Sequence, residues 1–265
     1  MDFLNDLCEY YKTTPENALE LGTRSIGRRP DLPASPTTQA VTGKTFEDIW
    51  EIKKRESVQD IFDFYEDQGA WSAFRQVVRH KDLTQLHMSL LSQTVRPGTT
   101  FCEYGCGVAP FSNTLLSCID DTSLPLTLCI SDVKSEHFRF GIWRLKKRIA
   151  DRGLKNVDLV PVEIKVNELP VYPKKIDTLF IFEVLEHVPS PLATLKNIEE
   201  QMNSGALLCE NFILHEETHN HDGPDLSSAR SERGPYYGEL VKKFNLVGGP
   251  EPFFRPNETR VWQKK

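Results

Sequence analysis

The sequence predicts an α/β fold, a mostly parallel seven-stranded sheet with helices on both faces, preceded by an N-terminal helical cap. Three observations predict it. From Thr99 onward, short apolar segments alternate with helical ones, as in sheets whose strands are joined by helical crossovers. Before residue 96, apolar residues recur at spacings near three and four, which is the helical period. Between the two regions, Arg96-Pro97-Gly98 marks a sharp boundary.

The apolar segments give the expected strands, and the amphipathic segments give the helices between them. Five strands are expected to form the main sheet: Thr99–Tyr104, Leu126–Ser131, Val157–Val162, Ile176–Phe182 and Ala206–Phe212. Two late strands close the chain, at about Leu246–Phe254 and Arg260–Gln263. Helices are expected over Phe111–Cys118, His137–Asp151, Leu192–Met202 and Tyr237–Phe244.

The chain therefore divides into residues 1–96, an arm and helical cap or lid, and residues 97–265, the sheet domain. A short helical start precedes a stretch rich in Pro, Ser, Thr and Gly at residues 27–44, which is typical of an irregular arm. From Thr45 to Thr94 we expect two or three helices, broken near Gly69 and near His80–Asp82.

The composition limits the kinds of partner, location and metal site that we expect for this protein. The formal net charge of −6 argues against a broad phosphate-binding surface, so a nucleic-acid partner is not expected. No apolar run approaches the ~18 residues that cross a bilayer, and the N-terminus lacks the features of a signal peptide. The six cysteines include no CxxC pair, which favours free thiols in a reducing, cytoplasmic location and no structural zinc.

A glycine turn follows the first expected strand. Glu103 stands at the end of that strand, and Gly105 and Gly107 would let the backbone turn tightly and approach a ligand. A helix start follows, which offers N–H groups to a polar ligand. An ordinary strand–turn–helix connection would need the same glycines. The second strand ends at Asp132, which suits either hydrogen bonds to ribose hydroxyls or an N-cap of the next helix.

The fourth strand closes on Glu183-Val184-Leu185-Glu186-His187-Val188. Together with the acidic residue and GxGxA turn of Glu103–Ala109, this segment resembles class I (Rossmann-like) S-adenosylmethionine-dependent methyltransferases. The resemblance covers about residues 97–212. A dinucleotide-binding GxGxxG pattern fits less well, because its sixth position is Pro110.

The resemblance implies S-adenosyl-L-methionine as the cofactor and a set of residues around it. Glu103, Gly105 and Gly107 would lie along the methionine and ribose, and Asp132 would bind the ribose. Phe182 and Glu183 would approach the methionine end. Glu163, after the third strand, is the candidate for the adenine contact.

Histidines supply the candidate catalytic residues. His187 could be a first-turn residue beside Glu186, a general base, or part of a metal site with Glu183, Glu186 and a later histidine, as in the small-RNA 2′-O-methyltransferases that the ExxEH pattern resembles. His215, His219 and His221 follow the fifth strand, where they could accept a proton or form a solvated loop. Tyr10, Tyr11 and Tyr65 of the cap could reach the cofactor or the substrate.

The expected function is methyl transfer to an oxygen or nitrogen of a small-molecule or sugar-like acceptor. No metal is assigned. The alternatives are a metal-dependent RNA 2′-O-methyltransferase and a catalytically silent module that keeps the cofactor pocket.

Overall fold

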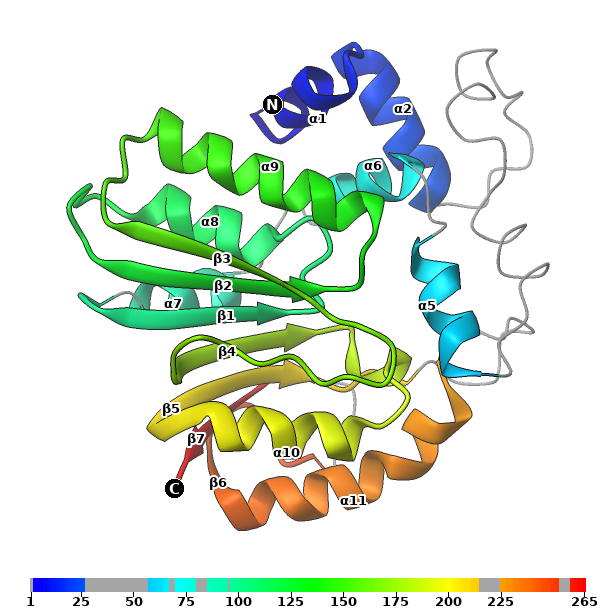
Figure 1. The fold of residues 1–265 in the computed structure, drawn as a ribbon, viewed down its shortest axis with the longest axis vertical. Coiled ribbons are helices and arrows are strands. Elements are labelled where there is room, and N and C mark those ends of the chain that lie inside the picture. Colours follow the sequence, from blue (N-terminus) through cyan, green and yellow to red (C-terminus); the bar gives the residue numbers. More distant parts are fainter. Residues whose placement is uncertain are drawn as a thin grey trace.

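The structure, a computed structural model, describes residues 2–26, 57–66, 70–79, 85–94, 96–214, 225–252 and 258–265. Its centre is a seven-stranded sheet in the order β3-β2-β1-β4-β5-β7-β6 (Figure 1). The first five strands run parallel, whereas β7 is antiparallel to both of its neighbours. The strands are β1 (Thr99–Tyr104), β2 (Leu126–Asp132), β3 (Val157–Glu163), β4 (Ile176–Phe182), β5 (Met202–Asn211), β6 (Phe244–Gly248) and β7 (Arg260–Lys264).

Helices cover both faces of the sheet, because alternate residues of the strands point to opposite sides. Phe101 and Phe180 join the core on the side of α8 (Pro110–Cys118) and α9 (Glu136–Asp151). Cys102 and Leu179 join the core on the other side, under α10 (Pro191–Gln201) and α11 (Ser227–Lys243) (Figure 1). This Rossmann-like arrangement confirms the predicted fold class.

The cap consists of α1 (Asp2–Tyr11), α2 (Pro15–Ile26), α5 (Val58–Glu66), α6 (Ala70–Arg79) and α7 (Gln85–Thr94). Helices α1, α2 and α6 share a third core with α9 through side chains such as Leu7, Phe74 and Phe140. Helix α7 packs on α8 instead, with Leu91 in the α8 and α9 core. Of the two or three helices expected between residues 45 and 94, the described residues contain three, α5, α6 and α7. The expected breaks near Gly69 and His80–Asp82 and the arm at 27–44 lie outside the described residues.

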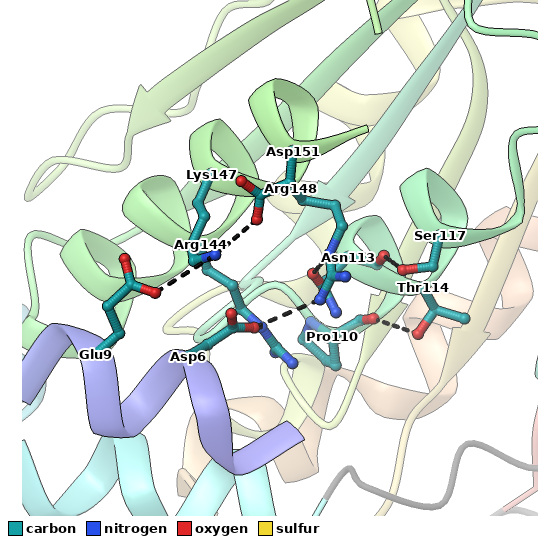
Figure 2. A network of polar contacts seen from close by, with 10 residues as sticks. All are labelled: Asp6, Glu9, Pro110, Asn113, Thr114, Ser117, Arg144, Lys147, Arg148 and Asp151. Carbon is teal, nitrogen blue, oxygen red and sulfur yellow. Dashed lines mark hydrogen bonds and ion pairs between the residues drawn. The ribbon is translucent and has the colours of Figure 1, made fainter. Parts of the chain in front are cut away.

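A buried ion pair ties the cap to the sheet domain. Asp6 of α1 accepts a hydrogen bond from Arg144 Nε of α9 at 3.0 Å, and both side chains are less than one-tenth exposed. Arg148 extends the contact, because its Nη2 lies 3.6 Å from Asp6 and its Nε donates to Asn113 of α8 (Figure 2). Removing either partner of such a pair would leave a buried charge.

Three boundaries differ from the prediction. Helix α11 begins at Ser227, ten residues before the expected Tyr237, although Pro235 lies inside it. Gly234 and Pro235 are exposed, so water can bond the carbonyl that proline leaves without an N–H partner. Strand β5 starts at Met202 instead of Ala206, with a register irregularity against β4, and β6 spans only Phe244–Gly248. No helix in the described ranges is long and apolar enough to cross a membrane.

Candidate functional site

A cavity of about 660 Å³ opens at the carboxyl ends of β1, β2 and β4. Its volume falls within the range of small-molecule sites, and ligands bind at this edge in open α/β sheets. Its walls come from the turn after β1, the ends of β2 and β4, the segment after β3, and helices α5 and α6 of the cap. The cap therefore closes a cavity whose floor belongs to the sheet.

The turn after β1 alternates between ordinary and left-handed backbone. Gly105, Gly107 and Ala109 have φ values of 63°, 52° and 51°. Gly105 also needs to lack a side chain, since a Cβ there would lie 2.4 Å from Val184 Cγ2 of the loop after β4. The glycine turn and the loop after β4 thus pack directly against each other.

The backbone N–H groups of this turn are bonded within the protein. Cys106 N donates to Ser131 O, Gly107 N to Asp132 Oδ2, Val108 N to Gln76 Oε1, Ala109 N to Cys106 O, and Phe111 N and Ser112 N to Glu103. Every N–H between residues 106 and 112 therefore has a protein acceptor. A phosphate cradle would need several of these donors for its ligand.

Glu103 is 3% exposed and serves mainly the start of α8. Its carboxylate accepts from Ser112 N at 2.7 Å and from Ser112 Oγ at 2.5 Å. Burial raises the pKa of Glu103 to about 7, although the Ser112 and Phe111 hydrogen bonds and the Arg144 charge oppose the shift. Glu103 also lines the cavity, where its negative charge would favour a cation.

Asp132 lies at the end of β2 and binds the glycine turn. Its Oδ2 accepts from Gly107 N at 2.5 Å, and its Oδ1 accepts from Val133 N at 2.7 Å. Burial raises its pKa to about 6, against the effect of these two bonds. Each carboxylate oxygen has a second lone pair, so Asp132 can still accept two hydroxyl donors from a ligand. The N-cap of α9 is Ser135, whose side chain accepts from Phe138 N, so Asp132 does not fill that role.

Phe182 and Glu183 reach the cavity from the end of β4. The Phe182 ring packs 4.8 Å from that of Phe111, centroid to centroid. Glu183 has a φ of 53°, and its N–H donates to Asn211 Oδ1 of β5 at 2.6 Å. A left-handed glutamate costs about 1–2 kcal/mol, so the side chain of Asn211 holds a strained residue against the cavity.

Glu186 and His187 line the cavity from a short 3-10 helix, Leu185–His187. Glu186 is fully buried, and its Oε1 lies 3.8 Å from Nε2 of His187. The Tyr65 ring of α5 lies 6.3 Å from the His187 ring. Burial, and then the negative charges of Glu186, Asp132 and Asp225, raise the pKa of Tyr65. A carboxylate, an imidazole and a phenol therefore meet in this part of the cavity.

Other predicted residues are not brought to the cavity. Glu163 is exposed at the edge strand β3 and does not line it. Tyr11 donates to Glu136 at 3.1 Å and packs with Tyr10 on the third core, so of the three cap tyrosines only Tyr65 lines the cavity. His215, His219 and His221 lie outside the described residues. In the part of the chain that is described, no three His, Cys, Asp or Glu side chains gather closely enough to hold a metal ion.

The sequence analysis did not assign many of the cavity residues to the site, and four polar ones from α6 and α9 are notable. Ser72, Arg75 and Gln76 come from α6, and His137 comes from the first turn of α9. His137 Nδ1 and Ser72 Oγ are 2.7 Å apart. Their polar character inside an amphipathic helical pattern was a signal, but only the folded structure shows which cavity they face.

No protein-family model matches the chain, and no curated protein matches it. Three solved structures illustrate what it resembles. An S-adenosylmethionine-dependent methyltransferase from Aquifex aeolicus has a TM-score of 0.48 at 15% identity, over 79% of this chain and 98% of that one. The magnesium protoporphyrin IX methyltransferase of Synechocystis, with bound S-adenosylhomocysteine, has a TM-score of 0.44 at 15% identity, over 82% and 91%. The small RNA methyltransferase HEN1 has a TM-score of 0.48 at 14% identity, over 68% of this chain and 25% of that one.

The order of the five parallel strands, β3-β2-β1-β4-β5, and the cavity at their carboxyl ends are those of a Rossmann-like sheet.

Proposed function

We propose that the protein is an S-adenosylmethionine-dependent methyltransferase acting on an oxygen or nitrogen of a small-molecule acceptor. One observation carries the proposal: Asp132 at the end of β2 bonds the glycine turn after β1, and both line the same cavity. These are the two places that the class I methyltransferase pattern implies for the ribose and the methionine. The third motif, Phe182–Val188, lines the cavity as well.

The internal bonding of the glycine turn supports this cofactor over a dinucleotide. A dinucleotide places its diphosphate against free N–H groups at the helix start. Here Val108 N donates to Gln76, and Phe111 N and Ser112 N donate to Glu103. A nucleoside without phosphates needs no such donors, whereas its ribose hydroxyls need acceptors, which Asp132 supplies.

Charge supports the same ligand. Glu103, Asp132, Glu183 and Glu186 line the cavity, and such carboxylates stabilise a sulfonium and an ammonium group. Arg75 of α6 lines it too and would pair with the ligand's carboxylate. When bound, the cofactor supplies an electrophilic methyl group on its sulfonium sulfur.

The residues of the chain then have three tasks. The cap and the loop after β4 exclude water and hold the acceptor in line with the methyl group. The apolar side chains of Val58, Ile61 and Phe62 on α5 give a small molecule an apolar wall. His187, or a histidine of the 215–221 loop, accepts the proton that a hydroxyl or amine must lose.

The first experiment is calorimetric titration of the protein with S-adenosylhomocysteine. Asp132→Ala should weaken binding by roughly 1.5–3 kcal/mol, the value of hydrogen bonds to a charged group. Asp158→Ala, at an exposed position of β3 outside the cavity, is the matched control and should bind normally. Unchanged affinity of Asp132→Ala would contradict a role for this residue in cofactor binding. If the wild type does not bind S-adenosylhomocysteine, the proposed function is wrong.

The proton acceptor is tested by single His→Ala variants at positions 187, 215, 219 and 221, once an acceptor is in hand. General-base catalysis contributes typically 10²–10⁴-fold in rate. The base should therefore show a large fall in turnover with near-normal cofactor affinity. If all four variants keep full turnover, proximity alone drives the transfer.

The rival is methylation of an RNA 2′-hydroxyl with a metal ion, which the ExxEH segment of Glu183, Glu186 and His187 favours. Magnesium or manganese dependence, lost in Glu186→Gln, would promote this rival over a small-molecule acceptor. The net charge of −6 favours the small molecule.

A further inference from the structure

Helix α6 of the cap lines the cavity with Arg75 and with two uncharged polar side chains, Ser72 and Gln76. Four residues apart, they lie on one face of the helix, one turn from each other. Each contacts a different part of the sheet domain. Gln76 Oε1 accepts from Val108 N in the glycine turn at 3.2 Å, and Ser72 Oγ lies 2.7 Å from His137 Nδ1 in α9.

His137 stands where the cap, α9 and the glycine turn meet. One turn further along α9, a Cβ at Gly141 would lie 2.9 Å from Gly107 O, so this face of the helix abuts the glycine turn. His137 lies on the same face, five residues after Asp132, and lines the same cavity while being 3% exposed. The imidazole is thus part of the wall beside the ribose-binding carboxylate.

The imidazole is neutral. Burial, and then the nearby charge of Arg139, lower the pKa of His137 to about 4. A neutral ring is a donor at one nitrogen and an acceptor at the other. With Nδ1 paired to Ser72, Nε2 has no hydrogen bond to any other residue of the described ranges. Such a group offers a hydrogen bond to a ligand without repelling a cationic sulfonium.

We propose that His137 is a further binding residue for the nucleoside part of the cofactor, through Nε2, and that Ser72 of the cap orients its ring. The inference rests on the proposed function and adds a residue to it. The cap then does more than cover the cavity, because it fixes the direction of a ligand contact.

The alternative is that Ser72 and His137 merely dock the cap on α9 as a satisfied buried pair. The two readings differ in what a conservative substitution does. Asparagine places its polar group near the position of Nδ1, and glutamine reaches the position of Nε2. A docking pair needs the first group, whereas a ligand contact needs the second.

The test is the affinity of the full chain for two probes, S-adenosylhomocysteine by calorimetry and free adenosine by competition with it. His137→Asn should raise both dissociation constants by the same factor, between about threefold and tenfold, the range of one hydrogen bond. His137→Gln should restore most of the affinity. Ser72→Ala should raise both constants by a smaller factor, because the ring loses its orientation and keeps its nitrogen.

Val78→Ala is the control for cap docking, since Val78 is a buried residue of α6 in the third core and does not line the cavity. It should lower the melting temperature and leave both dissociation constants unchanged. Equal affinity of His137→Asn and wild type for both probes overturns the proposal. A change for S-adenosylhomocysteine alone overturns the nucleoside assignment. If the wild type binds neither probe, the proposed function fails and the inference falls with it.

Discussion

Two turns meet at the cavity, and they are built in opposite ways. The turn after β1 places its left-handed backbone on Gly105 and Gly107, with Ala109 as the third such residue, and its N–H groups donate mainly to acceptors on β1, β2 and α6. The loop after β4 places a left-handed backbone on Glu183, which depends on Asn211 of the next strand. In the first turn, glycines adopt the left-handed backbone without strain. In the second, Glu183 keeps its side chain despite the strain of this conformation.

The difference suggests a division of labour. A cofactor common to many reactions can be held by backbone shape and a few carboxylates. The acceptor and its proton need a side chain in a particular place, and strained residues concentrate where such a place is functional. Substitutions in the two turns should therefore have opposite consequences for stability.

The largest effect is expected from Gly105→Ala. The new Cβ meets Val184 and sits at a φ of 63°, so we expect a loss of roughly 3–5 kcal/mol in unfolding free energy and loss of cofactor binding. Gly153→Ala is the matched control, because Gly153 has a φ of 61° and open space around its Cα. Denaturant unfolding should show a loss of only about 1–2 kcal/mol there. Equal losses would mean that contact between the two turns is unimportant.

His137, in the cavity wall beside the glycine turn, should make the free energy of unfolding depend on pH. The pKa of His137 falls from its ordinary 6.5 to about 4 in the folded chain, so below pH 6.5 the unfolded chain binds a proton that the folded chain does not. Stability from this group is full above pH 6.5 and is lost as pH falls toward 4, by at most ~3 kcal/mol. His137→Phe should lack this loss.

The difference between wild type and His137→Phe is the quantity to measure, by urea unfolding at several pH values. The pKa values of Glu103 and Asp132 are raised to about 7 and about 6, so their contribution falls as pH rises through those values, in the opposite direction. Both residues are present in the two proteins and cancel in the difference. A difference that does not vary with pH would contradict a buried neutral His137.

In the loop after β4, Asn211→Ala removes the acceptor of the Glu183 N–H. We expect a loss of about 1–2 kcal/mol, because the bond is 2.6 Å long and part-buried. Turnover should fall more than the affinity for S-adenosylhomocysteine, because Glu183 is expected at the methionine end, beside the methyl group that this product lacks. Unchanged turnover would contradict a functional role for the strained Glu183.

The smallest effect is expected from Glu183→Gly, and it has the opposite sign to Gly105→Ala. Glycine relieves the left-handed strain but gains entropy in the unfolded chain, which leaves a net stabilisation of up to ~1 kcal/mol. Turnover should fall at the same time, because the carboxylate is lost. A destabilised Glu183→Gly would show that the side chain contributes to folding.

Local sequence signals were sufficient to predict most strands of the sheet. Strands β1 and β4 have the predicted bounds, because short segments rich in β-branched and aromatic residues, bounded by turn residues, favour strands. The start of α11 was missed because Gly234 and Pro235 usually end helices, and their exposure decides the matter only in three dimensions.

The cavity residues at the ends of strands could also be predicted from local sequence. The predicted residues that line the cavity do so because each lies at the end of a strand or just after it, where the sheet fixes its position; they are Glu103, Gly105, Gly107, Asp132, Phe182, Glu183 and His187. Glu163 was chosen as an acidic residue after the third strand, but it is exposed and does not line the cavity. Ser72 and Gln76 carry no motif, since their role depends on where α6 docks.

The cap has a consequence for how the protein is assembled. Asp6 pairs with Arg144, 138 residues later, and Tyr11 bonds Glu136, 125 residues later. Ser72 contacts His137, which lies 65 residues later in the sequence. These cap helices are therefore synthesised before the residues of α9 that they contact, and the contacts can form only once α9 has been made. A truncated chain ending before residue 136 would carry the glycine turn but would lack the partners of Asp6, Tyr11 and Ser72 in α9.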